Sequence, residues 1–130
     1  MEGFICAMIY SKKRKINESY LNMLEQKISK AYLEAVKQYL SSADNDLERF
    51  TQRYSGMRNA LSPARYTMSR MLKRKISVDD VAGMMNLDVN SLDREERDVL
   101  EEEIQMAIDN PIETIGQDKF DELIKGFLHI

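Results

Sequence analysis

Eight basic side chains gathered in the middle of this chain have the chemistry to bind phosphate. They lie within residues 48–75, where Glu48 is the single acid. A guanidinium group suits phosphate because its planar fork donates two parallel hydrogen bonds. We therefore expect a basic face that contacts the backbone of DNA or RNA. We assign to it Arg49, Arg53, Arg58, Arg65, Arg70, Lys73, Arg74 and Lys75.

Two tyrosines, Tyr54 and Tyr66, lie in the same stretch. Exposed tyrosine rings could stack on unpaired bases. Both residues also match the apolar spacing of helices, so we expect them in the core instead. For the basic residues, the alternative is that they pair with the acidic half of the same molecule or of a neighbouring one.

The C-terminal half carries the opposite charge. Residues 1–75 contain 15 Lys and Arg against 7 Asp and Glu, whereas residues 76–130 contain 4 against 15. Such asymmetry bears on partners and association rather than on fold. We expect the acids of residues 93–103 to dock on a protein partner, and the alternatives are a solvated helix face or a mimic of phosphate charge. The assigned residues are Glu95, Glu96, Asp98, Glu102 and Glu103.

Nothing in the sequence favours catalysis. His129 and Cys6 are the single residues of their types, and together they cannot form a zinc site of the usual composition. The glycines are scattered singly, so there is no Gly-rich loop to hold phosphates. We predict a protein that is not an enzyme, with no catalytic residue, no metal ligand and no cofactor.

The elements that position these groups are expected to be helices. The chain has two prolines, five glycines and nine methionines, and this composition favours helices. Apolar spacing predicts helices over residues 17–41, 46–61, 63–75 and 77–86, then from Ser91 or Asp93 to Asn110, and from Gln117 onward. In the second of these helices we expect a buried stripe that includes Met57 and Leu61, and Ser62-Pro63 is typical of the start of the third.

We therefore predict an all-α fold, a compact bundle of five to six helices that forms a single domain over residues 1–130. Its basic helical half covers residues 16–75 and its acidic helical half residues 76–130. Residues 1–15 would form an apolar arm followed by a basic run, and the apolar residues 3–10 fit either a short strand or a buried helix.

The sequence also indicates a cytoplasmic protein that makes no membrane contact. No apolar run approaches the length needed to cross a bilayer. The single Cys6 fits a reducing compartment. In a secretory signal the basic residues precede the apolar run, whereas here the basic residues 12–15 follow it.

Residues 77–95 resemble the helix-turn-helix family. Val81 and Ala82 match inward positions of the first helix, Leu87 the apolar turn residue, and Leu92 an inward position of the second helix. The segment departs from the family in two ways, because Asn86 stands where a turn glycine is common and the second helix is acidic. DNA phosphates would repel an acidic helix. We therefore expect an ordinary helical hairpin.

Our leading hypothesis is a small helical binding subunit or regulator. Its basic face would contact nucleic-acid backbone without reading sequence, and its acidic half would dock on a protein. One alternative is a protein-only adaptor or inhibitor that acts through its acidic helix, with the arginines paired internally. Another is a homo-oligomeric assembly protein in which residues 3–10 form an exchanged arm.

Overall fold

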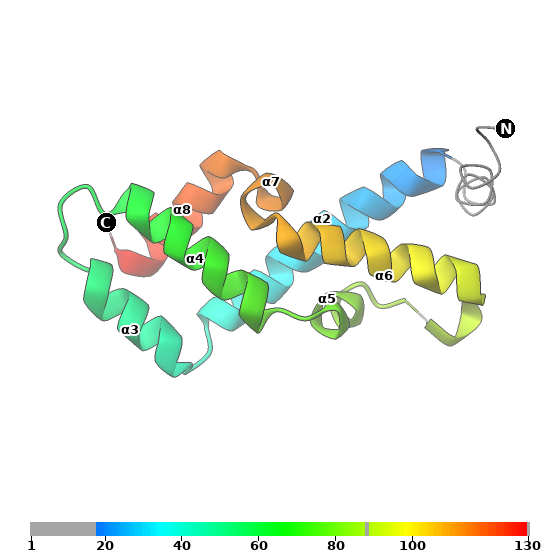
Figure 1. The fold of residues 1–130 in the computed structure, drawn as a ribbon, viewed down its shortest axis with the longest axis horizontal. Coiled ribbons are helices and arrows are strands. Elements are labelled where there is room, and N and C mark those ends of the chain that lie inside the picture. The colour runs from blue at the N-terminus through cyan, green and yellow to red at the C-terminus, as the bar shows by residue number, and fades with distance from the viewer. Residues whose placement is uncertain (1–17, 88, 130) are drawn as a thin grey trace, which may run out of the picture.

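A computed structural model describes residues 18–87 and 89–129, and these residues fold into helices without any strand (Figure 1). This confirms the all-α class for the described part of the chain. The elements in order are α2 (Glu18–Leu40), α3 (Asn45–Tyr54), α4 (Leu61–Lys75), α5 (Val78–Met84), the short 3-10 helix η1 (Val89–Ser91), α6 (Arg94–Asp109), α7 (Pro111–Ile115) and α8 (Gln117–Leu128). The expected apolar arm at residues 3–10 and the basic run at residues 12–15 lie outside the described residues.

The helices pack as two groups around one continuous core. Helices α2, α5 and α6 contact one another, α4 contacts both α3 and α8, and α7 contacts helices of both groups. Figure 1 shows α3, α4 and α8 at one end of an elongated molecule and α2 with α6 at the other. The core includes Tyr32 and Leu72 from the basic half and Ile104 and Phe120 from the acidic half. Apolar burial therefore joins the two halves whatever their charge.

Local capping explains where α5 and α6 begin. The Ser77 hydroxyl accepts a hydrogen bond from the Asp80 amide, and the Asp80 carboxylate accepts one from the Ser77 amide. Asp93 and Glu96 make the same reciprocal pair at the start of α6. Each pair satisfies backbone donors that have no partner inside the helix. Ser77, the first residue of the helix predicted over residues 77–86, is thus the cap of α5. Of the two predicted starting residues of the next helix, Ser91 and Asp93, the cap of α6 is Asp93.

The predicted helix over residues 46–61 was too long, because α3 ends at Tyr54. Gly56 follows with φ +78° and Asn59 with φ +55°, and both values lie in the left-handed region that interrupts a helix. Met57 is consequently 47% exposed instead of buried, and Leu61 begins α4. Ser62 does not cap α4, whose N-cap position is Ala60.

Helix α7 raises the number of α-helices in the described residues to seven, where the sequence predicts five or six. Asn110-Pro111 ends α6 as expected. Pro111 also stands at the start of α7, where its fixed φ suits a helix and its missing N–H would have no intrahelical partner. The same residue therefore ends one helix and starts the next.

The connection between α5 and α6 differs from the turn of a helix-turn-helix. Nine residues, 85–93, separate the two helices, whereas that family uses a turn of about three or four residues. Asn86 has φ +55° and so takes the left-handed conformation for which glycine is common in such turns. Helices α5 and α6 contact each other, but the nine-residue connection is also longer than the two to five residues of an ordinary helical hairpin. Among the described helices, none is long and apolar enough to cross a membrane.

Candidate nucleic-acid interface

An open groove between α3 and α4 gathers four of the eight predicted phosphate-binding residues. Its volume is about 670 Å³. The groove is lined by Arg53, Tyr66, Thr67, Ser69, Arg70, Met71, Lys73 and Arg74. We call it the α3–α4 groove. Its lining includes four cations and no carboxylate, so its electrostatic potential favours an anion.

The period of α4 places the basic residues in this groove. Ala64, Met68 and Leu72 recur at every fourth position and are buried. A residue two positions further along a helix of 3.6 residues per turn points roughly to the opposite side. Arg70 and Arg74 occupy such positions and are exposed. The core face of α4 therefore determines which of its cations face solvent.

Helix α3 contributes one residue, Arg53, to the lining of the groove. The Tyr54 hydroxyl and Thr67 Oγ1 lie 2.6 Å apart and form a hydrogen bond that joins α3 to α4. The guanidinium carbon of Arg53 lies 5.5 Å from the centre of the Tyr54 ring. Tyr54 is 2% exposed, which confirms the expectation that it packs in the core. This contact holds Arg53 beside the cations of α4.

For Tyr66 the expectation of core packing was wrong, because this side chain is 66% exposed. It stands two residues after the buried Ala64 and therefore on the solvent face of α4. The guanidinium carbon of Arg70 lies 5.8 Å from the centre of its ring. The sequence did hold a signal, since Tyr66 precedes Arg70 by four residues and so shares a helix face with it.

Arg65 does not belong to the groove, because it pairs with Asp121 of α8. Arg65 Nε donates to one carboxylate oxygen at 2.7 Å, and a terminal guanidinium nitrogen donates to the other at 2.8 Å. The two hydrogen bonds raise the pKa of Arg65 and lower the pKa of Asp121. Arg65 therefore pairs with the acidic half of the molecule, which was the alternative to phosphate binding.

Lys75 is also engaged within the protein. Its Nζ lies 2.9 Å from Asp46 and 3.2 Å from Asp44, and these hydrogen bonds raise the pKa of Lys75. The Tyr39 hydroxyl donates to Asp44 at 2.6 Å, and this bond is the main reason why the pKa of Asp44 is lowered. The cluster fixes the end of α4 against the start of α3.

The two remaining predicted cations, Arg49 and Arg58, lie outside the groove as well. The Arg49 side chain is 81% exposed and lies 3.9 Å from Asp46, which makes at most a weak ion pair. Arg58 is exposed in the loop between α3 and α4. The predicted set of eight therefore divides into four groove residues, two paired residues and two solvated ones.

The five predicted acids of α6 do not lie on one surface. A groove of about 500 Å³ between α5 and α6 is lined by Val78, Asp79, Asp98, Glu101, Glu102 and Gln105, and we call it the α5–α6 groove. It includes two of the predicted acids, Asp98 and Glu102, with Asp79 and Glu101, which the sequence reasoning did not assign. Glu95 and Glu96 stand in the first turn of α6, where Glu96 closes the capping pair, and neither lines this groove.

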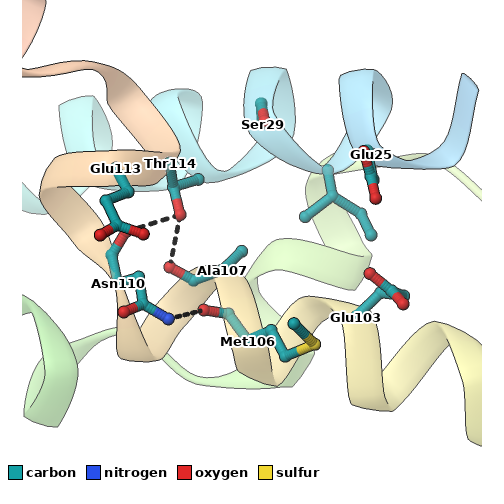
Figure 2. A pocket seen from close by; sticks show the side chains of 9 residues that line it. Glu25, Ser29, Glu103, Met106, Ala107, Asn110, Glu113 and Thr114 are labelled. Carbon is teal, nitrogen blue, oxygen red and sulfur yellow. Dashed lines mark hydrogen bonds between the residues drawn. The ribbon is translucent and has the colours of Figure 1, made fainter. Parts of the chain in front are cut away.

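Glu103 lines a different pocket, between α2, α6 and α7, with a volume of about 340 Å³. Figure 2 shows Glu25 and Glu103 at one end of this pocket and Glu113 at the other. Thr114 closes its wall by donating a hydrogen bond to the Ala107 carbonyl at 2.8 Å. The three carboxylates disfavour an anionic ligand here. In the described part of the chain, no group of three or more His, Cys, Asp or Glu is placed to hold a metal ion.

Comparison with protein-family models, with curated proteins and with solved structures found no match to this chain. The four cations that line the α3–α4 groove can bind an anion electrostatically.

Proposed function

We propose that this protein is a non-enzymatic binding subunit or regulator that holds the phosphate backbone of a nucleic acid in the α3–α4 groove. The observation that carries the proposal is the gathering of four cations in one open groove without a carboxylate. Three of these cations are arginines, whose planar groups match phosphate oxygens. Contacts to phosphate carry no sequence information, so a groove whose cations bind phosphate makes a contact that is independent of sequence.

The number of cations predicts how binding responds to salt. Each phosphate neutralised on a single strand contributes about 0.7 to the slope of log Kd against log salt concentration, so four contacts predict a slope of about 3. Affinity should then fall about 50-fold as salt rises from about 50 to 200 mM. Unrelated oligonucleotides of equal length should give the same curve.

The test replaces two groove cations and compares a matched control. The double variant Arg70→Glu with Arg74→Glu should bind a labelled oligonucleotide at least about tenfold more weakly, with about half the salt slope. Lys27→Glu with Lys30→Glu makes the same change in net charge at exposed positions of α2 and should bind as the unchanged protein does. Fluorescence anisotropy measures both. Equal loss in the two variants, or no binding by the unchanged protein at low salt, contradicts the proposal.

The acidic half gives the protein a second surface, which we propose as the dock for a protein partner. The supporting observation is that Asp79, Asp98, Glu101 and Glu102 line the α5–α6 groove without a cation among its lining residues. A basic partner surface is complementary to it. The single Cys6 is typical of a reducing compartment and supports a cytoplasmic setting for both contacts.

Two alternatives, a protein-only adaptor and a self-assembling protein, are each distinguished from the proposed function by one measurement. For the adaptor the measurement is nucleic-acid binding, because the unchanged protein then binds none, while the Asp98→Lys with Glu102→Lys variant loses the protein partner under either function. If copies associate, the basic groove of one copy faces the acidic groove of the next, and the mass measured by sedimentation rises with concentration and falls with salt. A constant monomer mass excludes assembly.

A further inference from the structure

We infer that the ligand of the α3–α4 groove is a single-stranded nucleic acid and that Tyr66 stacks on one of its unpaired bases. This inference rests on the proposed function and adds the substrate class and the residue that selects it. The cations of the groove would attract any polyanion, whether duplex, single strand or acidic protein. Tyr66 is the feature that distinguishes among them.

Four large apolar side chains are exposed in the described part of the protein, namely Met23, Met57, Tyr66 and Met106. Tyr66 is the aromatic one, and it alone of the four lines the cationic groove. Leaving two thirds of a large ring in water forgoes the free energy that burial would supply. A base that stacks on the ring would recover that burial, and every base has a face suited to it.

The ring is positioned for this contact before any ligand arrives. Tyr66 projects from a regular helix whose neighbouring turns are fixed by the buried Ala64 and Met68. The guanidinium carbon of Arg70 lies over one face of the ring, 5.8 Å from its centre. A base that stacks on the opposite face therefore has a cation close to it for the adjoining phosphate. A rigid aromatic anchor loses little entropy on binding.

The spacing along α4 suits a few nucleotides. Tyr66, Arg70 and Arg74 follow one another at intervals of four residues on one side of the helix. At about 1.5 Å per residue they extend over about 12 Å. This length matches about four nucleotides at the ~3.4 Å rise of a stacked strand. In a duplex the base faces are covered by their neighbours, so the phosphates could reach the cations but Tyr66 would find no base to stack on.

The first test uses fluorescence. The chain contains no tryptophan, so Tyr66→Trp introduces a single tryptophan reporter that retains a stacking ring. Its emission should be quenched by a thymine oligonucleotide of about ten nucleotides, and not by a duplex or by an abasic strand of the same length. Met106→Trp, at a position 56% exposed on α6, supplies the control and should show no quenching.

The second test separates the base from the phosphate. Tyr66→Ala should lower affinity for the thymine oligonucleotide about tenfold and leave affinity for the abasic strand unchanged. Tyr66→Phe keeps the ring and should bind the oligonucleotide as tightly as the unchanged protein does. Equal affinity of the unchanged protein for the abasic strand and the oligonucleotide overturns the inference, while the proposed phosphate contact stands. Binding of a duplex but of neither single strand overturns the inference alone. Binding of neither the strands nor a duplex, or binding of polyglutamate as tightly as the oligonucleotide, overturns both.

Discussion

At the scale of single residues, two buried tyrosines differ in how their hydroxyl groups are satisfied. Tyr54 shares a hydrogen bond with Thr67. The Tyr32 hydroxyl is buried and has no hydrogen-bond partner among the described residues. Burial raises the pKa of Tyr32, so its hydroxyl stays protonated at all ordinary pH values. A desolvated polar group without a partner opposes folding.

This contrast predicts opposite effects for the same substitution. Tyr32→Phe removes the desolvated hydroxyl and should raise the free energy of unfolding by about 1 kcal/mol. Tyr54→Phe removes the hydrogen bond to Thr67 and should lower the free energy of unfolding by about 1 kcal/mol. Urea denaturation measures both values. If Tyr32→Phe destabilises the protein as much as Tyr54→Phe does, the Tyr32 hydroxyl has a partner in solution.

At the scale of elements, the backbone conformation of Gly56 ends α3 and so determines how α3 is placed against α4. Gly56 has φ +78°, and an added methyl group would meet nothing within 4 Å, so backbone strain alone opposes a larger residue. Gly126 lies inside α8 with the same open space and without a positive φ. The two sites differ in backbone conformation and not in packing.

Alanine at these two positions should accordingly change stability in opposite directions. Gly56→Ala should lower the free energy of unfolding by about 1 kcal/mol, because the left-handed conformation is strained for alanine. Gly126→Ala should raise it by about 0.5–1 kcal/mol, because alanine is the better helix former. Thermal unfolding followed by circular dichroism compares the variants. A stabilising Gly56→Ala substitution would show that α3 can continue beyond Tyr54.

At the scale of the whole molecule, an ion pair between described residues connects the basic half to the acidic half. Arg65 of α4 and Asp121 of α8 are 56 residues apart in sequence, and their side chains are 24% and 15% exposed. The pair makes two parallel hydrogen bonds, an arrangement stronger than a typical exposed ion pair. It supports the packing of α8 behind the helix that carries the groove cations.

The carboxylates of Asp121 and Asp44 make stability depend on pH. The pKa of Asp121 and that of Asp44 are both lowered below their ordinary value of 3.8, so these carboxylates stabilise the fold above about pH 4 and lose that contribution as pH falls further. Asp121→Asn should cost about 1–2 kcal/mol at pH 7 and weaken the acid dependence. Glu122→Gln removes the same charge from an exposed neighbour and should change stability by less than about 0.5 kcal/mol. An equal effect of the two substitutions would contradict this account.

Much of the fold follows from the sequence because its causes are local. Apolar residues at intervals of three and four predict the long helices. The predicted starts, Ser77 for α5 and Ser91 or Asp93 for α6, agree with the observed caps Ser77 and Asp93 to within two residues. The end of α3 was missed because Tyr54, Met57 and Leu61 keep a helical spacing across the turn at Gly56. An apolar pattern cannot distinguish one long helix from two shorter ones that share a register.

The residues of the candidate site could be predicted only in part from the sequence. The sequence determined that the basic residues gather between residues 48 and 75, and its composition indicated that helices carry them. The packing of α4 against α8 and α3 decided the rest, because it engages Arg65 and Lys75 in ion pairs and leaves Tyr66 with its neighbouring cations in an open groove. The physical reason is that helical spacing is a local property, whereas the partner of a side chain depends on which distant residue the folded core brings within a few ångströms of it.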